Sequence, residues 1–179
     1  RVLFRSGVEG FAVYGNSNFA YQYISDNYSH DINWDMEQIK VFTIDIETAT
    51  ENGFPDIRAA NEEVLLITVK DLASKRIITF GSKSFVHNRE DVIYVTCKNE
   101  QELLRHFMDF WVKSYPDVIT GWNTDFFDMP YLIRRIEREL GDGESNKISP
   151  WGYVNERKTF IKGNEERSEE HTAELQSHS

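Results

Sequence analysis

Two acidic residues in a strongly apolar segment are the first candidates for chemistry in this sequence. Asp45 and Glu47 lie in Ile39–Glu47, whose β-branched and apolar residues predict a β-strand. Side chains alternate along a strand, so both carboxylates point to one face, about 6–7 Å apart along the backbone. No basic residue shares that face, and an unpaired acid in an apolar setting is costly. A divalent cation would offset this cost, unless both acids lie at a solvent-exposed strand end.

A second polar group, Gly121–Asp128, follows about eighty residues later with the order Gly-Trp-Asn-Thr-Asp-Phe-Phe-Asp. It predicts the end of a strand, Asp117–Trp122, then a short loop and an aspartate at a helix start. Taken alone, Asp128 is most simply a helix N-cap and Asn123 a turn former. Taken with the two strand acids, Asp128 supplies a third oxygen ligand, so we expect the three carboxylates to converge on one pocket.

The two segments together resemble the first two exonuclease motifs of the family B DNA polymerases. The first motif is Asp-Ile-Glu at residues 45–47, and the second is Asn-x-x-x-Phe-Asp at residues 123–128. Ile119-Thr-Gly-Trp-Asn and Phe127-Asp-Met-Pro-Tyr131 are most similar to the replicative polymerases of T-even-type bacteriophages. The resemblance extends weakly back to about residue 8 and forward to about residue 163.

This resemblance implies an α/β fold, namely a truncated ribonuclease-H-like 3′–5′ proofreading exonuclease domain with a mixed β-sheet. Such a domain holds two divalent metals about 3.5–4 Å apart. By motif, Asp45 would bridge both metals, Glu47 would bind the metal that carries the nucleophilic water, and Asp128 would assist the second metal. Oxygen ligands suit Mg²⁺ or Mn²⁺.

The resemblance also implies contacts with a DNA substrate and with other proteins. Phe54, Asn123 and Phe127 are the expected substrate-binding residues, because the two phenyl rings can stack on terminal bases of frayed single-stranded DNA. Core packing is the alternative role for Phe127. The implied partners are the single-stranded 3′ end of a primer, the other domains of the parent polymerase and a sliding clamp. We expect no membrane partner, and a location in the cytoplasm of the host cell.

The strands that would position these residues are recognisable from composition and turn residues. After the first strand, residues 48–60 contain Gly53 and Pro55 and predict a loop. Val64–Lys70 and Ile77–Phe80 flank a polar turn and predict a hairpin. Val92–Cys97 predicts a further short strand. These strands precede an alternation of helices and strands, which is typical of an α/β domain.

Two amphipathic helices are predicted from apolar spacing and end signals. The first begins after Asn99, an N-cap with Glu102 three residues on, and ends at Tyr115-Pro116. The second is Met129–Leu140, with Asp128 as its cap and Gly141 as its end. The predicted buried stripes are Leu103, Leu104, Phe107 and Trp111 in the first helix, and Leu132, Ile133, Ile136 and Leu140 in the second.

The chain divides into four expected ranges. Residues 1–6 and 167–179 resemble translated sequencing adapters, so we expect them to take no part in the fold. Residues 7–38, with a strand at Phe19–Ile24, are the expected remnant of a polymerase N-terminal domain. Residues 39–166 are the expected N-terminal part of the exonuclease domain.

Charge and cysteine content exclude several classes of protein. Thirty acidic residues against twenty basic residues leave a net charge of −10. A general cationic binder of nucleic acid or membranes needs the opposite balance. The single cysteine, Cys97, excludes an internal disulfide framework and a multi-cysteine zinc site. No apolar run approaches the ~20 residues of a membrane span.

The third exonuclease motif of the family, a further aspartate with a nearby tyrosine, has no match after Asp128. Tyr131 and Tyr153 do not lie in the motif's setting, and Asp142 is most simply a turn residue between two glycines. We therefore expect a fragment of the enzyme with little or no activity of its own. The alternatives are a non-catalytic nucleic-acid-binding module and a stand-alone nuclease of the same fold.

Overall fold

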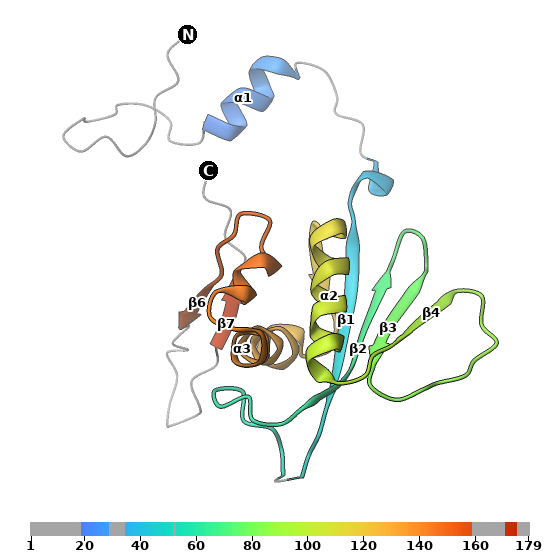
Figure 1. Ribbon diagram of the computed structural model, residues 1–179. Helices are drawn as coiled ribbons and strands as arrows, with labels where there is room; N and C mark the ends of the chain where they lie inside the picture. The colour runs from blue at the N-terminus through green and yellow to red at the C-terminus, as the bar shows by residue number, and fades with distance from the viewer. Residues whose placement is uncertain (1–18, 29–34, 52, 159–170, 175–179) are drawn as a thin grey trace. The chain divides into compact units, whose positions relative to one another are not determined.

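The computed structural model describes residues 19–28, 35–51, 53–158 and 171–174 (Figure 1). The chain forms two compact units, Arg1–Met36 and Glu37–Ser179. In the first unit, Phe19–Asn27 form helix α1, so the expected strand at Phe19–Ile24 is wrong. Aromatic residues favour strands only where a neighbouring strand pairs with them, whereas a helix satisfies its backbone groups within itself.

The second unit is built on a mixed five-stranded sheet in the order β4-β3-β2-β1-β5. β1 pairs antiparallel with β2 and parallel with β5, and β3 pairs antiparallel with β2 and parallel with β4. The predicted hairpin and mixed sheet are thus confirmed. The bounds are β1 (Val41–Thr48), β2 (Val64–Asp71), β3 (Ile77–Gly81), β4 (Val92–Thr96) and β5 (Val118–Thr120).

Helix α2 (Glu100–Ser114) lies against the sheet, and α3 (Met129–Leu140) lies beside α2 (Figure 1). Asn99 caps α2 as predicted, since its Oδ1 accepts a hydrogen bond from the Glu102 N–H at 2.9 Å. The short turns are η1 (Met36–Gln38), η2 (Thr124–Asp128) and η3 (Glu144–Ile148). Among the described residues, no helix combines the length and apolar character of a membrane span.

The core lies between the sheet and these two helices. All four predicted core residues of α2 are buried, and so are three of the four in α3, while Leu140 is half-buried. Aromatic rings pack edge to face here. The ring centroids of Phe42 in β1 and Trp111 are 6.1 Å apart, and those of Phe80 in β3 and Phe107 are 6.0 Å apart. The Trp111 Nε1–H also donates to the Ile148 carbonyl at 2.8 Å, which fastens η3 to α2.

A second, two-stranded sheet joins β6 (Asn155–Lys158) to β7 (His171–Glu174). The expectation that residues 167–179 take no part in the fold is therefore wrong for residues 171–174. The unpaired edge of one strand offers backbone donors and acceptors to any extended segment, whatever its side chains. The rest of that range, and residues 1–6, lie outside the described residues.

A buried ion pair joins the two helices. Arg135 of α3 donates from Nε and Nη2 to the two carboxylate oxygens of Glu100, at 2.7 and 2.6 Å, and the residues are 6% and 7% exposed. Arg135 Nη1 also donates to the carbonyls of Ala60 and Asn61, at 2.8 and 2.9 Å. Glu100 accepts a further bond from the Val64 N–H at 2.7 Å. One pair therefore ties together α2, α3, the 60–61 loop and the start of β2.

We expect Glu100→Gln to destabilise the domain strongly, because it leaves the Arg135 guanidinium buried without its main counter-charge. The loss in free energy of unfolding should be about 3–5 kcal/mol. Urea unfolding at neutral pH measures it.

The matched control is Glu144→Gln, which removes the same charge from an exposed pair with Lys147. That change should cost less than about 1 kcal/mol. Equal losses in the two variants would show that the buried pair has no special role.

Candidate functional site

Strand β1 presents Asp45 and Glu47 on its exposed face. Its burial alternates as predicted, with Phe42, Ile44 and Ile46 directed into the core. Both acids lie in the second half of the strand and are exposed. Solvent, as well as a cation, can therefore stabilise their charges.

Asp128 reaches the edge of β1 across 82 residues of sequence. β5 pairs with β1 only as far as Thr43, so the Ile46 N–H lies beyond the end of β5. The carboxylate of Asp128, which is 3% exposed, accepts this N–H through Oδ1 at 3.4 Å. A backbone donor that the sheet leaves without a partner is thus satisfied by the residue that precedes α3.

The predicted N-cap role of Asp128 is wrong. Its φ and ψ of −59° and −55° are helical, and its side chain makes no capping hydrogen bond. The π-helical turn η2 leads directly into α3, and the Met129 N–H donates to the Thr124 carbonyl. Since the backbone of η2 already satisfies the start of the helix, the Asp128 carboxylate is available for the strand edge.

The pKa of Asp128 is raised to about 6, chiefly because the carboxyl is buried and in part because the negative charge of Asp45 is near, while the Ile46 N–H acts in the lowering direction. The Thr124 hydroxyl acts weakly in the lowering direction. It makes no hydrogen bond of acceptable geometry, however, and both its Oγ1 and Asp128 Oδ2 are buried without a partner. A buried carboxylate oxygen without a donor beside a second carboxylate fits a divalent cation, which would favour the ionised form.

Asp45 lies near enough to Asp128 for its negative charge to raise the pKa of the Asp128 carboxyl. The described residues contain no group of three His, Cys, Asp or Glu side chains arranged to hold a metal ion. The convergence of Glu47 with the other two carboxylates therefore stays a prediction. The residues fit a cation held by two carboxylates more closely than a complete two-metal site.

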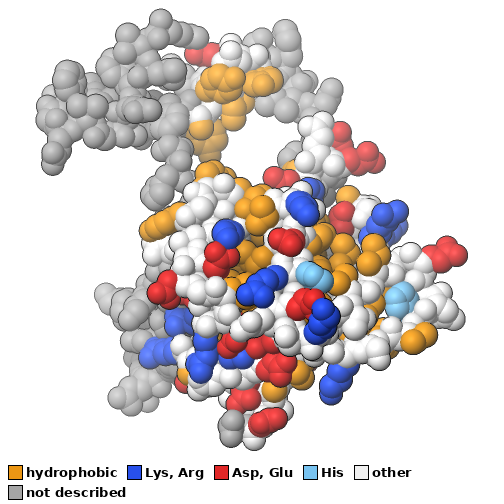
Figure 2. All heavy atoms as spheres, viewed as in Figure 1, with side chains coloured by type: hydrophobic (Ala, Val, Ile, Leu, Met, Phe, Trp, Pro, Cys, Tyr) orange, Lys and Arg blue, Asp and Glu red, His pale blue; other side chains and the backbone are white. Residues whose placement is uncertain are grey.

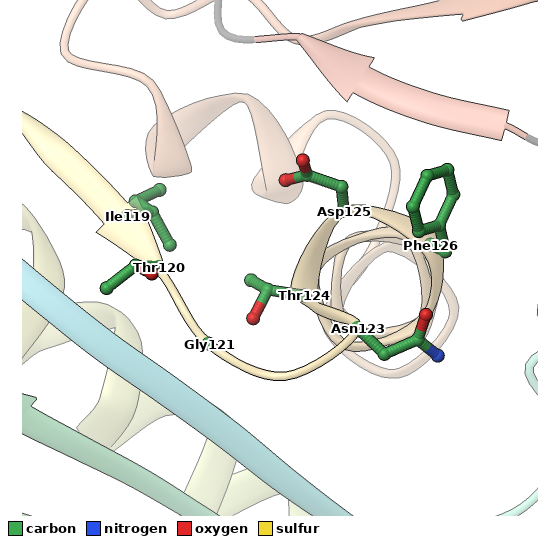
Figure 3. Close-up of a pocket in the computed structure, with 7 residues that line it drawn as sticks. All are labelled: Ile119, Thr120, Gly121, Asn123, Thr124, Asp125 and Phe126. Carbon is green, nitrogen blue, oxygen red and sulfur yellow. The ribbon is translucent and has the colours of Figure 1, made fainter.

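The loop after β5 presses closely on β1. A Cβ at Gly121 would lie 2.5 Å from the Ile44 carbonyl oxygen and would also strike the Thr124 hydroxyl, so only glycine fits here. Asn123 forms the turn with φ of 60°, as expected of a turn former. A cavity of about 220 Å³ adjoins this loop. Figure 3 shows the residues that line it, Ile119, Thr120, Gly121, Asn123, Thr124, Asp125 and Phe126.

Three aromatic rings form a row beside Asp128. Phe54, with 83% of its surface exposed, lies 5.4 Å from Phe127 between ring centroids. Phe127 lies 5.4 Å from Tyr131, which is buried. Phe127 is half-buried and packs against the core, as its alternative role predicted, whereas the Phe54 ring is left to solvent.

Three residues that position this site were not predicted from the sequence, namely Glu100, Gly121 and Arg135. Arg135 had a recognisable signal, because it interrupts the apolar stripe of α3 at a position that faces the core. A charged residue there requires a buried partner. The partner itself was not recognisable, because Glu100 also suits an ordinary first turn of a helix.

The comparisons with known proteins all indicate the same family. The model of DNA polymerase family B, exonuclease domain, matches residues 14–178. The DNA-directed DNA polymerase of Escherichia phage RB69 is 28% identical over 178 residues, which cover 86% of this chain and 19% of the relative. That of Enterobacteria phage T4 is 28% identical over 170 residues, with 81% and 19% covered. A DNA polymerase of Thermococcus litoralis is 32% identical over 121 residues, with 67% and 6% covered. The chain thus spans a small part of the length of these relatives.

We expect the metal-free domain to lose stability as pH rises from about 4 to about 6. In this window folded Asp128, with its raised pKa, keeps a proton that the unfolded chain has released. The unfolded state therefore binds fewer protons, and the free energy of unfolding falls by about 3 kcal/mol. Urea unfolding in a chelator at several pH values measures this slope.

Other carboxylates titrate in the same range, so the comparison is between variants. Asp128→Asn should remove this part of the slope, while Asp142→Asn, in an exposed turn, should keep it. A slope that is unchanged in Asp128→Asn would contradict the assignment.

Proposed function

Because the chain belongs to the exonuclease domain of DNA polymerase family B, we propose that it supplies part of a 3′–5′ proofreading site within a longer replicative polymerase. The mixed α/β sheet is of the ribonuclease-H-like kind that this family carries. The proposed reaction is hydrolysis of the 3′-terminal phosphodiester of DNA. The proposed partners are the single-stranded 3′ end of a primer, the remaining polymerase domains and a sliding clamp.

In this proposal Asp45, Glu47 and Asp128 hold Mg²⁺ or Mn²⁺. The placement of Asp128 carries the argument. Its Oδ1 accepts the Ile46 N–H, its Oδ2 is buried without a partner, and the charge of Asp45 lies near the carboxyl group. Bound divalent cations would supply the charge that activates water and stabilises the departing 3′-oxygen.

The anchoring of Asp128 serves orientation. A carboxylate that rotates freely loses entropy when it binds a ligand, but one that is already held by a backbone N–H loses less. Asp45 lies on the exposed face of β1, so both solvent and substrate can reach it from that face. The protein residues thus set the direction from which a 3′ end must approach.

Stacking is the proposed source of affinity for the DNA. Figure 2 shows acidic and basic side chains interspersed over the described part of one face, without an extended basic area. With a net charge of −10, phosphate attraction alone cannot hold a strand on this surface. The exposed ring of Phe54, supported by Phe127, offers a terminal base a stacking partner, and the Asn123 turn lies next to the cavity.

One observation favours a second candidate, a metal-independent nucleic-acid-binding module. The described residues lack a ready group of three metal ligands, and Asp128 already has a structural task at the strand edge. The two candidate functions differ in whether the acidic residues bind a cation, and cation binding can be measured directly.

We expect the 179-residue chain to bind Mn²⁺ weakly through Asp45 and Asp128. Isothermal titration should show binding that Asp45→Ala and Asp128→Asn each weaken markedly, because each removes one of few ligands. Asp142→Asn, in the exposed turn between two glycines, is the control and should leave Mn²⁺ affinity unchanged. Equal affinity in all variants would favour the metal-independent module.

We also expect the chain to release 3′-terminal nucleotides from a labelled single-stranded oligonucleotide very slowly or not at all. A metal with too few ligands stabilises the leaving oxygen poorly, and removal of one such stabilising group commonly costs about 10²–10³ in rate. The reference is a longer chain that extends to the third motif of the family. Rapid cleavage by the short chain that Asp45→Ala abolishes would show that a complete site is already present.

A further inference from the structure

The loop from Gly53 to Glu62 lies along one face of the η2–α3 segment. Phe127, Tyr131, Arg134 and Arg138 recur at the spacing i, i+4, i+7 and i+11, which places them in one row on a helix. Each member of the row contacts this loop or supports such a contact. The Phe54 ring packs on Phe127, and the Tyr131 hydroxyl donates to the Glu62 carbonyl at 2.6 Å.

Three arginines of α3, here called the arginine clamp (Arg134, Arg135 and Arg138), donate to four consecutive carbonyls of this loop. The bonds are Arg134 Nη1 to Arg58 O (3.4 Å), Arg138 Nη1 to Ala59 O (3.1 Å), and Arg135 Nη1 to Ala60 O (2.8 Å) and Asn61 O (2.9 Å). Arg138 Nη1 also donates to the side chain of Asn61 at 2.6 Å. Hydrogen bonds from charged donors are stronger than neutral ones, so the clamp holds the loop to α3.

Phe54 lies at the tip of the clamped loop, between a glycine that allows a sharp turn and a proline that restricts the backbone. Gly53 has φ of +100°, and Pro55 is buried. The Asp56 carboxylate accepts from the Arg58 N–H at 2.7 Å and closes the turn that follows. The Phe54 ring gains little from burial, since 83% of it is exposed. A rigid support for an exposed ring reduces the entropy lost when a partner stacks on it.

We propose that Arg138 is a positioning residue that holds Phe54 in place to stack on the terminal base of a single-stranded 3′ end, with Arg134 in a lesser part. This inference rests on the proposed function, because it assigns a task within the same site. Arg138 acts through the loop and does not touch the DNA. Arg135 shares the clamp, but its pairing with Glu100 also holds the fold together, so its substitution cannot test the proposal.

The test measures binding of a single-stranded oligonucleotide, labelled at its 5′ end, to the 179-residue chain by fluorescence anisotropy in a chelator. No metal and no cleavage are involved. The variants are Phe54→Ala, Arg138→Gln and the double substitution. Arg105→Gln, on the exposed side of α2, is the matched control, because it removes the same charge far along the chain from the loop.

Phe54→Ala should weaken binding about 10- to 100-fold, the usual effect of losing one stacking partner. Arg138→Gln should weaken it roughly five- to tenfold. The double variant should bind no more weakly than Phe54→Ala alone, since the clamp has nothing left to position. Arg105→Gln should bind like the parent chain, and Arg138→Lys, which keeps a donor, should recover part of the loss.

Independent losses that multiply in the double variant would overturn the proposal. The proposal would also be overturned if Arg138→Gln reduced the slope of log affinity against log salt concentration by about one unit, because that change indicates a direct phosphate contact. An unchanged affinity in Arg138→Gln, or a parent chain that does not bind the oligonucleotide, would overturn it too. Failure of the Mn²⁺ titration together with a non-additive cycle would instead refute the proposed metal-dependent reaction and leave the positioning role intact.

Discussion

The buried pair of Glu100 and Arg135 is the constraint on which the arrangement of this domain depends. Two charges removed from water are tolerated only when every donor and acceptor around them is satisfied. Here that condition is met by bonds to the start of β2, to the 60–61 loop and between α2 and α3. The helix that follows Asp128 consequently has one position relative to the sheet. The strand-edge contact of Asp128 and the loop that carries Phe54 both follow from that position.

The short length of β5 creates the second constraint. The strand ends at Thr120, and the next residue, Gly121, lies so close to β1 that no side chain fits. The chain then turns at Asn123 and returns to the same edge of β1 through η2. Asp128 satisfies the Ile46 N–H there and in exchange becomes buried beside Asp45 with one oxygen unpartnered. We expect a carboxylate held in this way to reduce the stability of the metal-free fold, which is a frequent property of residues kept for binding or catalysis.

Much of the fold could be predicted, because its signals are local. Alternation along β1 and the Asn99 cap of α2 were recognisable from adjacent residues, and the hairpin from its turn. The errors arose where a distant partner decides the outcome. Phe19–Ile24 has the composition of a strand but forms a helix. Asp128 is a residue type common at helix N-caps and directly precedes a helix, but its carboxylate accepts a hydrogen bond from strand β1 instead. Residues 171–174 form a strand because β6 offers an unpaired edge, which no pattern in their own sequence reveals.

The sequence by itself determined which side chains could do chemistry. The strand period places Asp45 and Glu47 on one face, and the two motif segments indicate the family, because residue type and spacing can be read without knowledge of the fold. Only the tertiary structure decided which oxygen of Asp128 remains without a partner, and that three arginines hold the loop beneath Phe54. Both features depend on contacts between separate elements. Packing and burial bring these elements together although their residues lie seventy or more positions apart in the sequence. Desolvation and hydrogen-bond geometry act between atoms in space, so sequence spacing alone does not predict them.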